Sequence, residues 1–132
     1  MRHNRDRAHT GFTLVEIMVV VATIALLAAI VTPSWLRARK RVQASRVLED
    51  MRLIDHAIDQ YAMDTHKLSG TSLDFGDIRE YVKKNGVLYD TGADLFGRPY
   101  GPFTIDRVPN IPSATLAALS DVTDSTFWSP YE

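Results

Sequence analysis

The chain of 132 residues is long enough for one small domain, and its formal net charge of −1 favours neither nucleic acid nor an acidic partner. It contains no cysteine, which excludes disulfide bonds, thiolate metal ligands and a cysteine nucleophile. The charges are unevenly spread. A basic leader, an apolar segment, a basic collar (residues 37–41, with Arg37, Arg39, Lys40 and Arg41) and an acidic remainder follow one another along the chain.

Residues 12–32 form the apolar segment, in which Glu16 is the one charged side chain. A bilayer core of roughly 30 Å needs about 20 helical residues, so the length predicts a single transmembrane helix. A cleaved secretory signal is a weaker interpretation, because its apolar region is usually shorter and holds no glutamate. A plain signal anchor stays open. In a plain anchor, Glu16 would lie near the membrane interface. An acidic residue costs about 2.5–3.5 kcal/mol at the centre of a span and less near its end.

A cut between Gly11 and Phe12 would account for both the leader and Glu16. The new amino group would lie four residues, or one helical turn, before the carboxylate. Glu16 would also occupy the first turn of a helix, where the backbone dipole favours negative charge. We hypothesise that Glu16 pairs with an amino terminus of its own or a neighbouring chain and sets the register between subunits in lipid.

The sequence GFTLVE (residues 11–16) after a short basic leader resembles the prepilin cleavage and methylation site of type IV pilins and type II secretion pseudopilins. The resemblance implies that a membrane prepilin peptidase cuts after Gly11 and N-methylates Phe12, and that Glu16 acts in assembly. Pro33 matches a helix kink of many family members, and a proline ring weakens a helix by about 3 kcal/mol.

The helix is predicted to continue as an amphipathic stretch over residues 34–66, which gives roughly 80 Å of helix from Phe12 onwards. Apolar side chains recur there at helical spacing: Val47, Leu48, Met51, Ile54, Ile58, Tyr61 and Ala62. Charged side chains, including Asp50 and Asp55, are predicted on the other faces. One apolar stripe therefore faces a small globular domain.

Residues 67–132 are predicted to form that domain. We expect a loop at 67–73, a short helix at 77–84, one or two helical turns at 113–119, and strands at VLYD (87–90), GPFTIDRV (101–108) and STFWSPY (125–131). The expected fold class is α+β. It is the pilin-like fold, with a long N-terminal helix packed on a small antiparallel sheet of about three strands.

The loop Asp94–Tyr100 resembles the Asp-x-aromatic-Gly-x-Pro-Tyr loop of the major pseudopilin. Gly97 permits a positive φ, Pro99 fixes the exit of the loop, and Tyr100 can anchor it on the core. The family's calcium loop is not recognisable near the C-terminus. Asp121 and Asp124 are weak calcium candidates, because the ion needs more oxygen ligands than two spaced aspartates supply. No other cofactor is expected.

Enzymatic interpretations are poorly supported. The four histidines, His3, His9, His56 and His66, form no catalytic pattern with a nucleophile, and no phosphate-binding glycine loop is present. We therefore expect a structural subunit and no enzyme.

The resemblance divides the chain into a leader (1–11), a transmembrane assembly helix (12–33), its amphipathic continuation (34–66) and the α+β domain (67–132). It implies a type II secretion pseudopilus subunit in the bacterial inner membrane, single-pass, with a cytoplasmic N-terminus and a periplasmic domain, assembled into a periplasm-spanning pseudopilus. The collar is at least as basic as the leader, so counting arginine and lysine alone would not give this orientation.

The partners implied are copies of this chain and other pseudopilins, the prepilin peptidase, an inner-membrane platform protein, an assembly ATPase and membrane lipid. The collar favours lipid headgroups or acidic residues of a neighbouring subunit over nucleic acid. The alternatives are a pilin or minor pilin of a cell-surface type IV pilus, serving adhesion, motility or DNA uptake, and a monomeric membrane-anchored binding domain.

Overall fold

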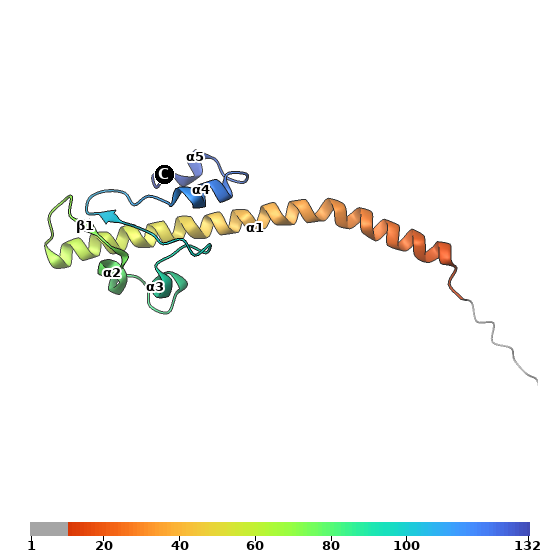
Figure 1. Ribbon diagram of the computed structural model, residues 1–132, viewed down its shortest axis with the longest axis horizontal. Helices are drawn as coiled ribbons and strands as arrows, with labels where there is room; N and C mark the ends of the chain where they lie inside the picture. The colour runs from red at the N-terminus through yellow and green to blue at the C-terminus, as the bar shows by residue number, and fades with distance from the viewer. Residues whose placement is uncertain (1–10) are drawn as a thin grey trace, which may run out of the picture. The chain divides into compact units, whose positions relative to one another are not determined.

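The computed structural model describes residues 11–132, so the expectations for leader residues 1–10, with His3 and His9, lie outside the described residues. In chain order the elements are α1 (Leu14–Thr65), β1 (Ser72–Leu73), α2 (Phe75–Ile78), the 3₁₀ turn η1 (Arg79–Tyr81), α3 (Val87–Thr91), β2 (Phe103–Thr104), α4 (Ser113–Leu119) and α5 (Ser125–Trp128) (Figure 1). They divide into two compact units, one ending at Leu36 and one running from Arg37 to Glu132.

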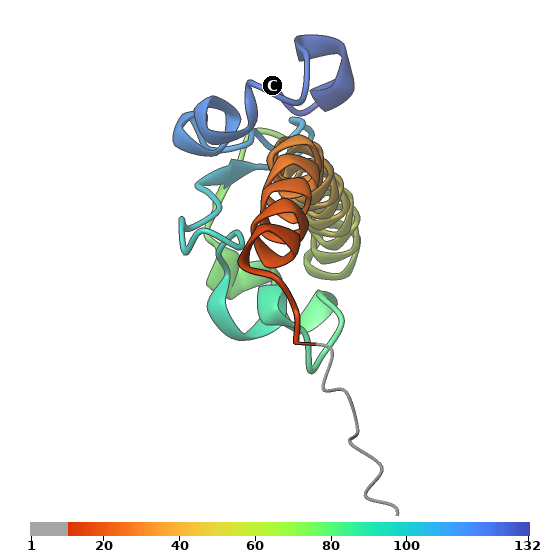
Figure 2. The ribbon, with the colours of Figure 1, turned by 90° about the vertical axis from the view of Figure 1, so that its right-hand side faces the viewer.

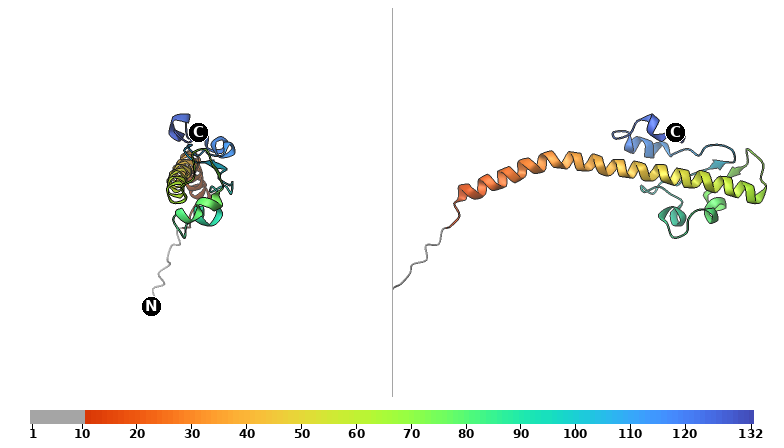
Figure 3. Two further views of the ribbon diagram at one scale, coloured as in Figure 1. Left: turned by 90° about the vertical axis from the view of Figure 1, so that its left-hand side faces the viewer. Right: turned by 180° about the vertical axis from the view of Figure 1, so that it is seen from behind.

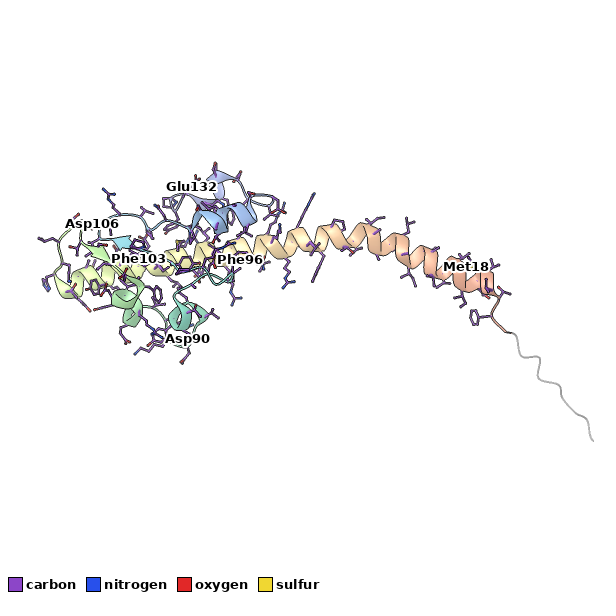
Figure 4. All side chains as sticks on the ribbon, in the orientation of Figure 1. Met18, Asp90, Phe96, Phe103, Asp106 and Glu132 are labelled. Atoms are coloured by element: carbon purple, nitrogen blue, oxygen red, sulfur yellow. The ribbon has the colours of Figure 1, made fainter. Side chains whose placement is uncertain are left out.

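The first unit contains the proximal part of α1. Every described side chain from Gly11 to Leu36 is exposed. The mean hydropathy of α1 reaches 2.8 over a window of 18 residues. The helix is therefore long and apolar enough to cross a membrane. Met18 shows the pattern, with its side chain projecting from the helix (Figure 4). The helix continues without interruption past Pro33. The ring of Pro33 has no N–H to donate a hydrogen bond to the carbonyl of Ala29.

The second unit is built around the distal part of α1. The predicted apolar stripe is confirmed, because its side chains enter the core at intervals of three and four residues. The fully buried set is Ala44, Val47, Met51, Ile54, Ala57 and Ile58. Figures 1, 2 and 3 show α2 and α3 on one side of this part of α1, with α4 and α5 on the opposite side.

The sheet consists of two short antiparallel strands, in which Ser72 pairs with Thr104 and Leu73 with Phe103. The amide of Ile105 extends the pairing by donating to the carbonyl of Thr71 at 3.0 Å. The ring of Phe103 is buried within the domain (Figure 4). The α+β class with a small antiparallel sheet is confirmed, and the expectation of about three strands is wrong.

Two of the predicted strands are helices. VLYD lies in α3, whose C-terminus is capped by Gly92 with φ 61°. The amide of Gly92 donates a hydrogen bond to the carbonyl of Leu88 at 2.9 Å. STFWSPY begins with α5, because Asp124 Oδ1 accepts a hydrogen bond from the amide of Phe127 at 3.0 Å and caps the helix. Local capping at these positions outweighs the strand preference of their aromatic and β-branched residues.

The remaining elements lie close to their predicted places. α1 ends at Thr65, one residue before the expected end, and α4 covers the expected residues 113–119. The short helix expected at 77–84 begins earlier, at Phe75, and passes into η1 at Arg79. The amide of Asp74 donates to the Asp77 carboxylate at 2.9 Å, which fixes this earlier start.

Candidate functional site

The first candidate site is the segment that precedes α1. Gly11, Phe12 and Thr13 are exposed and lie before the first helical residue, with 76% of Phe12 accessible. A Cβ atom built on Gly11 would meet no atom within 4 Å. The packing of the described chain therefore does not require glycine at this position.

Thr13 caps the N-terminus of α1. Its hydroxyl oxygen accepts a hydrogen bond from the amide of Glu16 at 3.3 Å, and its carbonyl accepts one from the same amide at 3.1 Å. Glu16 therefore lies in the first turn, close to the positive end of the helix dipole, with an exposed side chain. The sequence analysis missed Thr13, although Thr-x-x-Glu is the pattern of a capping box.

The second candidate site is the loop Asp94–Tyr100, which Asp94 organises from inside. Its Oδ1 accepts hydrogen bonds from the amides of Phe96 and Arg98, both at 2.8 Å. The amide of Asp94 donates to the carbonyl of Arg98 at 2.8 Å, and Gly97 turns the chain with φ 77°. The left-handed conformation at Gly97 is the one expected there. Asp94 is thus a buried scaffold for the loop.

The second carboxylate oxygen of Asp94 joins the loop to α4. Thr115, which is fully buried, donates its hydroxyl hydrogen to Asp94 Oδ2. Arg98 donates from its guanidinium to Thr115 Oγ1 at 3.2 Å and lies over the ring of Phe96, 5.0 Å from its centroid. Thr115 was not found from the sequence, because nothing local connects positions 94 and 115.

Tyr100 joins the same loop to α1. Its hydroxyl donates to Asp50 Oδ2 at 3.2 Å, and its amide donates to the carbonyl of Gly92 at 2.9 Å. Pro99 lies in a bridge with Ala93 that closes the loop. Burial raises the pKa of the Asp50 carboxyl, and the Tyr100 hydroxyl opposes part of that rise. Burial and the neighbouring Asp50 carboxylate raise the pKa of the Tyr100 phenol.

Asp50 and Asp55, which were predicted on the other faces of the helix, lie at the edges of its apolar stripe. Both are half-buried, and Asp55 Oδ2 accepts a hydrogen bond from the hydroxyl of Tyr131 at 3.3 Å. The spacing carried a signal, because Asp50 lies three residues after Val47 and four before Ile54. Two buried tyrosines of the domain, Tyr100 and Tyr131, therefore form hydrogen bonds with carboxylates at the edges of the apolar stripe.

Asp121 and Asp124 each have a partner within the protein. The ammonium of Lys40 lies 2.8 Å from Asp121 Oδ2, and this bond lowers the pKa of the Asp121 carboxyl. Asp124 caps α5 and accepts the hydroxyl of Thr126 at 2.8 Å. Within residues 11–132 no group of three or more histidine, cysteine or acidic side chains could hold a metal ion. Asp121 therefore forms an ion pair and Asp124 caps a helix, and their weak calcium candidacy stays a prediction.

Comparison with known proteins extends the likeness beyond the N-terminus. A family model described as the prokaryotic N-terminal methylation motif matches residues 6–32. Type II secretion system core protein G of Escherichia coli K12 is 28% identical over 99 residues, which cover 68% of each chain. The protein of that name from Aeromonas hydrophila is 29% identical over 106 residues, 73% of each chain.

The protein of the same name from Pseudomonas aeruginosa PAO1 is 29% identical over 119 residues, which cover 75% of this chain and 82% of the relative. No solved structure matches the chain. An alignment that covers three quarters of this chain must include many residues beyond the methylation motif.

Proposed function

We propose that this type IV pilin-like chain, whose resemblance to the major pseudopilin of type II secretion is confirmed, is a structural subunit of a type II secretion pseudopilus. The observation that carries the proposal is the methylation motif placed directly on an apolar helix whose proximal part is exposed throughout. Apolar surface of this extent needs lipid or other copies to cover it. The role proposed is structural, without catalysis by this chain.

Processing is the first step of the proposed role. A prepilin peptidase removes residues 1–11 by cutting after Gly11 and then methylates the amino group of Phe12. The exposure of this segment supports the proposal, since a peptidase can reach the backbone there. The open space around Gly11 also supports it, because the need for glycine then comes from the enzyme and not from packing.

Assembly is the second step. Glu16 of one chain meets the methylated amino terminus of another, the proximal helices form the filament core, and the domains project outward. A carboxylate in lipid is costly unless it is paired. The capped first turn of α1 supports this role, because it presents Glu16 beside the site of the new amino terminus.

The proposed location follows from the same helix. The chain is anchored in the bacterial inner membrane, crosses it once with a cytoplasmic N-terminus, and places residues 37–132 in the periplasm. Its partners are further copies, other pseudopilins, the prepilin peptidase, an inner-membrane platform protein and an assembly ATPase. The apolar length of α1 and the names of the similar proteins support the membrane and secretion parts of this proposal.

The mass of the N-terminal peptide, measured on protein extracted from its native membrane, tests the proposal. A chain that begins at Phe12 and carries one added methyl group is the expected result. A chain that still begins at Met1, from cells with an active prepilin peptidase, would contradict it. A cut after the apolar segment would instead indicate a secreted soluble domain.

Deletion of the gene separates secretion from surface piliation. We expect exoprotein release to be lost while any surface pili persist in electron micrographs. Loss of long surface filaments with normal exoprotein release would assign the subunit to a type IV pilus instead.

A further inference from the structure

The basic collar (residues 37–41) contacts the domain that follows it and also carries exposed arginines. Lys40 turns toward that domain and binds Asp121 at 2.8 Å. Arg37, Arg39 and Arg41 are exposed on α1. The collar therefore presents three guanidinium groups outside the domain core.

These arginines lie on two opposite faces of the helix. At 3.6 residues per turn, Arg37 and Arg41 share one face, and Arg39 lies on the opposite face between them. A neighbouring protein subunit docked on one side would use cations on one side. A layer that encloses the helix, such as lipid headgroups, contacts all of them.

Chain connectivity places the collar close to the membrane surface. Arg37 follows Pro33 by four residues, which cannot reach farther than about 14 Å even when fully extended. The headgroup layer on each side of the bilayer core is about 5–8 Å thick. Helical side chains tilt toward the helix N-terminus, which here is the direction of the apolar segment, so long arginine side chains reach back toward the headgroups.

The charge of the collar also acts against the proposed orientation. Arginine and lysine near a span favour the cytoplasmic side, yet the collar lies on the domain side. A favourable contact of these arginines with another group, formed once the chain is inserted, would offset the unfavourable charge distribution. Guanidinium groups suit phosphate particularly well, because they bind its oxygens in pairs.

We propose that Arg37, Arg39 and Arg41 bind the phosphate groups of anionic phospholipids in the leaflet on the domain side. This contact holds the unassembled subunit at a fixed depth, with its domain close to the surface. The inference rests on the membrane-spanning part of the proposed function. It adds a lipid class and the residues that recognise it.

The test uses the full-length chain reconstituted in phosphatidylcholine vesicles that carry a small fraction of spin-labelled lipid. The fraction of motionally restricted label is measured by electron paramagnetic resonance for phosphatidylglycerol and for phosphatidylcholine. We expect the wild-type chain to restrict phosphatidylglycerol about two- to threefold more, and this ratio to fall with added salt. The triple variant Arg37→Gln, Arg39→Gln, Arg41→Gln should bring the ratio to about one.

A second triple variant, Arg52→Gln, Lys83→Gln, Arg107→Gln, is the matched control. It removes three exposed positive charges that lie outside the collar and should keep the lipid preference. Circular dichroism of both variants verifies that the fold is retained. An equal loss of preference in the control would overturn the inference, because net charge alone would then explain it.

The outcomes also separate this inference from the function on which it rests. A wild-type ratio of one, with phosphatidylcholine still restricted, would overturn the lipid contact and leave the span in place. If the collar variant then failed to assemble in cells, its arginines would contact acidic groups of a neighbouring copy. Absence of any restricted lipid would overturn both the contact and the membrane span.

Discussion

The proximal and distal parts of α1 differ in what covers them. Ile24 is 60% exposed and Ile54 is fully buried, although both are isoleucines on one helix. The proximal part is apolar on all faces, whereas the distal part confines its apolar residues to one stripe. A stripe can be covered by a small domain of the same chain. A helix that is apolar all round needs a surrounding of lipid or other copies.

The largest effect is expected at the start of the proximal part. Glu16→Leu should leave cleavage after Gly11 near the wild-type level and lower filament assembly about a hundredfold or more. Removing one partner of an ion pair in an apolar surrounding costs about 3–5 kcal/mol. Peptide mass reports the cleavage, and sheared filaments on immunoblots report the assembly.

The control for this change is Glu49→Leu, which alters an exposed glutamate on the distal part. It should assemble normally. Normal assembly of Glu16→Leu would favour the monomeric membrane anchor and contradict the proposed function.

The matched isoleucines test the comparison directly. Ile54→Ala should lower the free energy of unfolding of the domain by about 2–5 kcal/mol, because it leaves a cavity in the core. Ile24→Ala should leave that free energy unchanged. Denaturant titration of the full chain in detergent micelles, followed by near-ultraviolet circular dichroism, measures both. An equal loss of unfolding free energy in both variants would mean that the two isoleucines are equally buried.

A smaller effect is expected where α4 meets the loop. Thr115→Val should destabilise the domain by about 1–3 kcal/mol, because one oxygen of the buried Asp94 carboxylate loses its hydroxyl donor. Ser113→Ala, an exposed change on the same helix, is the control. The same denaturant titration applies. A Thr115→Val chain as stable as wild type would show that Asp94 does not depend on this bond.

The smallest effect is a pH dependence at Asp50. Burial raises the pKa of this carboxyl in the folded protein above its ordinary value of 3.8. Well below pH 3.8, Asp50 is protonated in both the folded and the unfolded state. As pH rises through the window up to the folded pKa, the unfolded state releases its proton first and stability falls.

Asp50→Asn removes this titration and keeps an oxygen acceptor for the Tyr100 hydroxyl. Its stability should therefore decline less than that of the wild-type chain between pH 3 and 7 in urea titrations at a series of pH values. Asp59→Asn, which changes an exposed carboxylate on the same helix, serves as the control. A wild-type curve parallel to that of Asp50→Asn would contradict a raised pKa.

The sequence predicted the long helix, its apolar stripe and the α4 turn, because periodicity and capping are local signals. It failed at VLYD and STFWSPY, where segments of four to seven residues are too short for periodicity to separate strand from helix. The bonds of Asp94 to Thr115 and of Tyr100 to Asp50 depend on tertiary contacts across 21 and 50 residues. The roles of Gly11, Phe12, Glu16 and Pro33 stay predictions, since they concern an enzyme or neighbouring chains.

The position of the first buried side chain has a practical consequence for preparing this protein. Among the described residues burial begins at Ala44, and the ion pair of Lys40 with Asp121 lies within the unit that starts at Arg37. A shortened chain from Arg37 onwards would therefore lose the membrane-length apolar surface while keeping every buried contact. Such a fragment should be obtainable in water without detergent, which opens the domain to crystallisation and to solution nuclear magnetic resonance.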